Sequence, residues 1–226
     1  MKRNSLSGNL RFRHQAPIHI KMTEEKPLNP WFSIWLRPRA TIQQIVDTNP
    51  TRLVLVLVVL AGLPSVFEVC SKKTSLPTSL FLSFILGPLL GIIILYIGGA
   101  LLHLTGRWLG GLASPQNIRA ALAWSNVPII WALLLWIPKL SLFWSTSDVS
   151  FIDNSDPVGF ILLEKMIGIW SFVILLKCLG QVQGFSVWRA LGNSILAALF
   201  FLIIVVVVAQ LLVLIIFFIK LIPLLL

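Results

Sequence analysis

The sequence predicts an all-α polytopic membrane bundle of five spans, preceded by a short amphipathic helix at the inner interface. Five long apolar runs occupy most of the chain after residue 52. The chain is 57% hydrophobic and only 12% charged, whereas soluble domains carry about a quarter charged residues. The last run, Ile195 to Ile219, is interrupted only by Gln210. At about 1.5 Å per residue, a helix of that length covers the roughly 30 Å hydrocarbon core of a bilayer.

The five spans are expected near residues 53–69, 80–104, 119–137, 158–177 and 194–219. The second is rich in glycine, and its Gly87-x-x-x-Gly91 spacing favours close helix approach, either within the protein or in a homo-oligomer. The same spacing at Gly106 and Gly110 is expected to fall in a flexible inner loop. In the third span, Pro128 removes one backbone donor and frees the carbonyl of Trp124.

Basic residues predict the orientation of the spans, because inner loops of membrane proteins carry an excess of lysine and arginine. Nine basic residues precede the first span, and Arg107, Arg119, Lys177 and Arg189 bring the inner side to thirteen. The outer side holds four: Lys72, Lys73, Lys139 and Lys220. The N-terminus is therefore expected in the cytoplasm. The net charge of +10 is explained by orientation and does not indicate nucleic-acid binding. Cys70 and Cys178 are expected on opposite sides, which excludes a disulfide.

The segment before the first span mixes aromatic and basic side chains. Trp31, Trp35, Arg37 and Arg39 are candidates for contact with lipid or with a partner protein. From Pro38 onward, a short helix is expected to gather the apolar side chains of residues 42, 45 and 46 on one face. Such a helix can lie in the inner headgroup layer, or it can cap the cytosolic end of the bundle, and both can hold together.

Three stretches of the sequence resemble bacterial Yip-domain membrane proteins. They are the opening run from Asn29 to Pro50, the stretch from Ala120 to Pro128 and the stretch from Gly184 to Gly192. The resemblance covers about residues 29–220. It implies five spans, a cytoplasmic N-terminus and a bacterial inner membrane. Eukaryotic members bind Rab GTPases, but this chain lacks their long acidic, proline-rich cytosolic domain, so the resemblance does not imply Rab binding here.

Residues 1–28 are basic, polar and without periodicity, and they are expected to form a disordered tail before the membrane domain, residues 29–226. The run beginning at Met22 is a plausible translation start in its own right. Alternatively, the segment is a solvated tail that attracts anionic lipid.

Ionisable and amide side chains within the spans are further candidates, because their burial in hydrocarbon costs at least about 2.5–3.5 kcal/mol. Glu164 and Lys165 are neighbours in the fourth span and point about 100° apart, so they are not expected to pair with each other. Lys165 can extend toward the outer headgroups. Glu164 then requires a contact on another helix, or it forms an ion or proton site.

The remaining polar candidates have simpler interpretations. Glu68 lies at the outer end of the first span and is expected to be solvated, and His103 lies where it can reach the inner headgroups. Asn126 can satisfy the carbonyl that Pro128 frees, and Gln210 can make a hydrogen bond between helices.

The sequence shows no catalytic, cofactor or metal-binding motif, so we expect neither an enzyme nor a resident cofactor. The leading hypothesis is a scaffold that recruits proteins or anionic lipid at its inner face. Its partners are then the bilayer, anionic headgroups and a membrane or cytosolic protein. The alternative is a conduit for an ion or small solute that uses Glu164 and the glycine-rich second span. The lack of an internal repeat weakens the alternative, since many transporters are built from duplicated halves.

Overall fold

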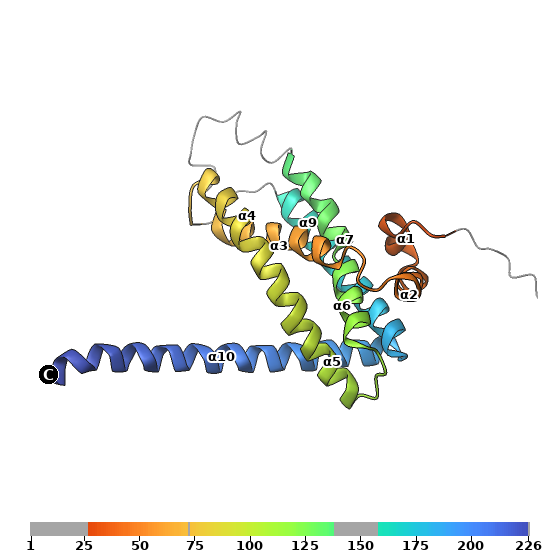
Figure 1. Cartoon of the computed structure of the whole chain (residues 1–226). Coiled ribbons are helices and arrows are strands. Elements are labelled where there is room, and N and C mark those ends of the chain that lie inside the picture. The colour runs from red at the N-terminus through yellow and green to blue at the C-terminus, as the bar shows by residue number, and fades with distance from the viewer. Residues whose placement is uncertain (1–26, 72, 138–157, 226) are drawn as a thin grey trace, which may run out of the picture.

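The computed structural model describes residues 27–71, 73–137 and 158–225, and every element in these ranges is helical (Figure 1). Five helical stretches are long and apolar enough to cross a membrane: Val54–Ser71, Pro77–Trp108, Pro115–Leu135, Val158–Gln183 and Val187–Phe217. The predicted five-span membrane bundle is confirmed. The second and fourth spans extend beyond their expected ends, to Trp108 and Gln183. The reason is that hydropathy marks the part of a helix that lies in hydrocarbon, and the helix itself can continue beyond it.

Helices α3 (Val54–Ser71) and α4 (Leu76–Ile93) pack against each other as a hairpin with very close backbones (Figure 1). A Cβ atom added at Gly62 would overlap the carbonyl of Gly87, and one added at Gly91 would overlap the carbonyl of Val58. The glycine spacing of the second span therefore brings two helices of the same chain together, which was one of the two expected uses.

The second span continues from α4 through a π-helical turn, η1 (Ile94–Gly98), into α5 (Gly99–Trp108). Gly110 ends α5 with a φ of 86°, and the N–H of Gly111 donates to the carbonyl of Gly106 over 2.8 Å. This is a Schellman motif. The expectation of a flexible loop over both glycines was wrong for Gly106, which lies buried in α5 where an added Cβ would overlap the side chain of Gln183.

The third span is divided into α6 (Pro115–Trp124), α7 (Val127–Ala132) and a 3-10 turn, η2 (Leu133–Leu135). At the break, the N–H of Asn126 donates to the carbonyl of Ala123, which leaves the carbonyl of Leu122 without its usual helical partner. The side-chain amide of Asn126 donates to Leu122 over 2.7 Å. The expectation that this amide would donate to the Trp124 carbonyl was therefore wrong. Because α6 ends at Trp124, before Pro128, the amide of Asn126 donates to the Leu122 carbonyl instead.

The N-terminal segment forms two short helices, α1 (Pro30–Leu36) and α2 (Pro38–Thr48), each beginning with a proline at its first position. α2 packs on α6 and α9, and Thr41 and Ile42 are completely buried there. Val46 packs against the core, as predicted for this face. These contacts match the interpretation of α2 as a cap on the bundle. Residues 1–26 of the expected tail lie outside the described residues, whereas Leu28 is held by two hydrogen bonds to Gln44.

The fourth and fifth spans are α9 (Val158–Gln183) and α10 (Val187–Leu225), joined by a turn at Gly184. α10 leaves the bundle instead of lying along it (Figure 1). Its main neighbours are α5 and α9, and its ring contact between Phe200 and Trp108 has a centroid distance of 5.4 Å. The side chains of residues 201–217 are all exposed. The fifth span is therefore attached to the bundle through its first turns.

Candidate functional site

The α1–α2 platform, Pro30–Thr48, is fixed to the bundle by its inward face. Ile34 is completely buried, and Trp31 meets the ring of Trp124 edge-on with a centroid distance of 5.8 Å. Farther along, the side-chain amide of Gln181 on α9 donates to Gln43 over 3.1 Å. These contacts hold the platform against α6 and α9, so that its outward face keeps a defined shape.

The outward face of the platform combines apolar and basic side chains. Phe32 is 62% exposed and Leu36 is 85% exposed. Arg37 and Arg39, which were predicted to contact lipid or a partner protein, are exposed beside them. Trp31, also selected, packs inward instead. Phe32 and Leu36 were not predicted as contact residues. The sequence nevertheless shows that they are four residues apart, which puts them on one helical face, and that Leu36 precedes Arg37.

A basic groove of about 400 Å³ lies where the platform meets the C-terminal part of α9. Its lining consists of three cations and four apolar or small side chains: Arg37, Arg39, Lys177, Leu36, Pro38, Ala40 and Val187. Lys177 was not among the predicted site residues, because the sequence does not show that the platform folds back beside the fourth span. Within residues 27–71, 73–137 and 158–225, no carboxylate forms an ion pair with these three cations. Among these described residues, the positive charge of the groove is therefore not paired with a carboxylate.

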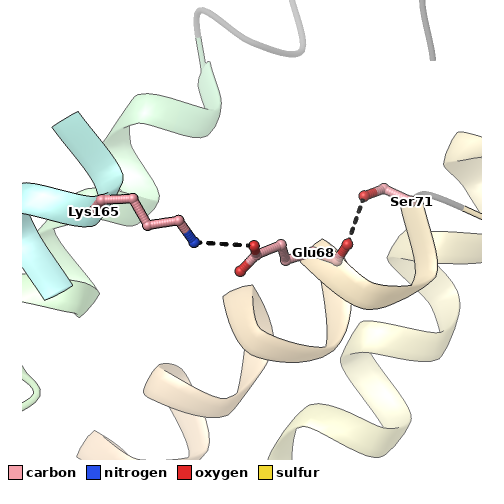
Figure 2. A network of polar contacts seen from close by, with 3 residues as sticks. All are labelled: Glu68, Ser71 and Lys165. Carbon is pink, nitrogen blue, oxygen red and sulfur yellow. Dashed lines mark hydrogen bonds and ion pairs between the residues drawn. The ribbon is translucent and has the colours of Figure 1, made fainter. Parts of the chain in front are cut away.

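On the other side of the bundle, Lys165 and Glu68 form an ion pair between α9 and α3 (Figure 2). The distance from Lys165 Nζ to Glu68 Oε1 is 3.4 Å, and both side chains are more than half exposed. Ser71 donates to the Glu68 carbonyl from the same helix end. The pair connects the first and fourth spans, which the sequence did not suggest because the two residues are 97 positions apart. Glu164 precedes Lys165 on α9, and its side chain is half-buried.

The other intramembrane candidates do not gather around Glu164. His103 is half-buried on α5, and Asn126 serves the carbonyl at the break in the third span. Gln210 lies on the exposed part of α10, so its predicted hydrogen bond between helices is not formed within the described chain. These residues thus belong to separate places in the fold.

A buried polar cluster, where the C-terminal ends of α5 and α9 meet the first turns of α10, was not predicted from the sequence. Asn193 is completely buried and makes two contacts to α5: it accepts from the hydroxyl of Thr105 and donates to the carbonyl of Leu102 over 3.2 Å. Gln183 donates to the same carbonyl over 3.4 Å. Its Oε1 atom is buried without a hydrogen-bond partner in the described chain. The cluster attaches α10 to the bundle, and only the positions of single polar residues in apolar runs could have suggested it.

The described residues contain no group of three histidine, cysteine, aspartate or glutamate side chains that could hold a metal ion. The two cysteines are far from equivalent, since Cys178 is buried and lies 3.8 Å from the carbonyl of Pro38, while Cys70 is half-buried at the far end of α3. What the described surface offers is a fixed platform with a cationic groove.

Comparison with known proteins agrees with this architecture. The family model described as the Yip1 domain matches residues 32–222, which include most of α1, all of α2 and all five spans. No curated protein and no solved structure matches the chain. Since the matched region covers most of its 226 residues, the chain belongs to the Yip1 domain family.

Proposed function

We propose that this protein is a non-catalytic membrane scaffold, which holds the α1–α2 platform at the cytoplasmic face and recruits a partner protein and anionic lipid there. The observation that supports this most is the division of the platform into two faces. Ile34, Thr41 and Ile42 are completely buried against the bundle, whereas Phe32 and Leu36 remain exposed next to two arginines. Exposed aromatic and arginine side chains on a rigid element are typical of binding surfaces.

The proposed location is the bacterial inner membrane, with the platform in the cytoplasm. The basic groove lies at the same end of α9 as the turn to α10 and the hydrogen bond from Gln183 to the Leu102 carbonyl of α5. That end carries the excess of basic residues expected on the cytoplasmic side. In a protein whose two native cysteines are replaced by serine, a cysteine introduced at Ala40, which is exposed, should react with a membrane-impermeant maleimide only after the membrane is opened. If this cysteine were labelled in intact spheroplasts, the platform would lie on the periplasmic side and the proposed orientation would be wrong.

Recruitment can be tested by crosslinking in cells with a photoreactive residue at Phe32. The wild-type protein should give defined crosslinked products, and Arg37→Ala with Arg39→Ala should lose them. The matched control is Arg107→Ala with Arg189→Ala, because these two arginines are also exposed and basic but do not line the groove. Identical products from all three proteins would contradict the proposal.

The conduit hypothesis has less support from the fold. The backbone of α3 packs directly against Gly87 and Gly91, so these two glycines are not available to line a path for an ion or solute. The basic groove does not include Glu164. Purified protein in liposomes should therefore show no solute flux that Glu164→Gln reduces. If such flux were measured, it would support the conduit hypothesis and contradict the scaffold hypothesis.

A further inference from the structure

The basic groove continues into a second hollow that is almost entirely apolar. This apolar groove of about 390 Å³ lies between α1 and α9 and is lined by Trp35, Leu36, Leu163, Met166, Ile167 and Trp170. Leu36 lines both hollows. Lys177 of the basic groove lies over the ring of Trp170 in the apolar groove, with Nζ 5.8 Å from the ring centroid. The two hollows therefore form one continuous surface, charged at one end and apolar along the rest.

The direction of this surface agrees with the direction of the membrane. On α9, Lys177 is near the cytoplasmic end in the proposed orientation, and Ile167 is ten residues nearer the outer side. Ten helical residues rise about 15 Å, which is half the roughly 30 Å hydrocarbon core. The charged end thus reaches the inner headgroup layer when the apolar end reaches the middle of the bilayer.

From this arrangement we infer that the joined grooves bind one anionic phospholipid of the inner leaflet, with its phosphate held by Arg37, Arg39 and Lys177 and one acyl chain lying in the apolar groove. The inference rests on the proposed function, since it names the lipid site of the same platform. Three neighbouring cations without a carboxylate partner in the described chain favour binding of an anion, because hydrogen bonds between cationic side chains and phosphate are strong. An anion with a long apolar chain attached satisfies both ends of the surface, whereas a free phosphate leaves the apolar groove unused.

The lipid would also act as a bridge between two elements. Arg37 and Arg39 belong to the platform, while Lys177 belongs to α9. Arginine suits this task because its planar guanidinium can donate two hydrogen bonds to one phosphate. The headgroup would therefore join the platform to the fourth span in addition to the buried contacts of Ile42 and Thr41.

The inference can be tested by titrating the full-length protein, in detergent or in nanodiscs, with phosphatidylglycerol and phosphatidylethanolamine that carry the same acyl chains. Bound lipid is measured by native mass spectrometry. Phosphatidylglycerol should bind at least fivefold more tightly. Lys177→Gln should weaken its binding about fivefold, as expected for the loss of one cation near an anionic lipid. The triple variant with Arg37→Gln and Arg39→Gln should weaken binding about a hundredfold, and Arg107→Gln should leave it unchanged.

The apolar end is tested by filling it. Ile167→Trp places an indole in the apolar groove and should weaken binding about tenfold, since the loss of two or three methylene contacts is sufficient for this effect. Ile169→Trp is the matched control, because Ile169 is exposed on the same helix and does not line the groove. Both substitutions leave Phe32, Arg37 and Arg39 unchanged, and none of these three lines the apolar groove, so partner crosslinking at Phe32 reports separately on the proposed function.

Three outcomes would overturn the inference. Equal binding of the two lipids would show that charge does not select the ligand. An equal loss with Arg107→Gln would show general attraction to a basic surface. Displacement of the lipid by millimolar inorganic phosphate, with no effect of Ile167→Trp, would assign the groove to free phosphate.

Discussion

Replacing Gly91 with alanine adds one methyl group at the closest approach of α3 and α4. The added Cβ would overlap the carbonyl of Val58, and the two backbones would have to separate by about 1 Å to restore an ordinary contact distance. Overpacking of this kind costs about 1–3 kcal/mol. Neither atom of the contact belongs to a flexible side chain, so the strain cannot be relieved by a rotamer change. We expect Gly91→Ala to lower the free energy of unfolding by this amount.

Gly168→Ala is the control for this experiment, because Gly168 lies in α9 and an added Cβ there would meet nothing within 4 Å. The same change at this site should stabilise the helix by up to about 1 kcal/mol, since alanine has the better helix propensity. Unfolding by sodium dodecyl sulfate in mixed micelles, followed by circular dichroism and tryptophan fluorescence, measures both variants. If Gly91→Ala and Gly168→Ala unfold at the same detergent fraction, the glycine contact does not hold the hairpin as described.

Three further predictions use the same assay or simple labelling. Asn193→Leu should cost about 0.6–1.7 kcal/mol, because it removes the hydrogen bonds that attach α10 to Thr105 and Leu102, and a neutral effect would show that the cluster adds no stability. Leu53→Gly should stabilise by about 0.5–1 kcal/mol, since Leu53 has a φ of 58°, a left-handed conformation that glycine adopts without strain; a loss of stability would refute this. A maleimide that enters the bilayer should label Cys70 in the folded protein and Cys178 only after unfolding, whereas equal labelling would mean that the platform does not cover Cys178.

The sequence predicted the features that depend on hydropathy and on local chemistry. The number of spans follows from runs of apolar residues, and the beginnings of α1 and α2 follow from Pro30 and Pro38. The buried positions Ile42 and Ile45 follow from helical spacing. Each of these depends on residues within one or two turns of each other.

The features that the sequence did not predict depend on which helices become neighbours. The glycine spacing at residues 87 and 91 left open whether the partner helix was in the same chain, and Lys165 gave no sign of Glu68. For the same reason Lys177 was overlooked as a groove residue, since it joins Arg37 and Arg39 only after the platform folds against α9. Pairwise placement of this kind is set by tertiary packing, which leaves no periodic trace in a single sequence.

The last span is longer than the thickness of the hydrocarbon core requires. Val187–Phe217 has 31 residues, which rise about 46 Å, whereas the hydrocarbon core is about 30 Å thick. A helix with such an excess leans over in a thin membrane and stands more upright in a thick one. Its first turns are anchored by Asn193 to Thr105. A change in tilt would therefore act on the C-terminal ends of α5 and α9, next to the basic groove that contains Lys177.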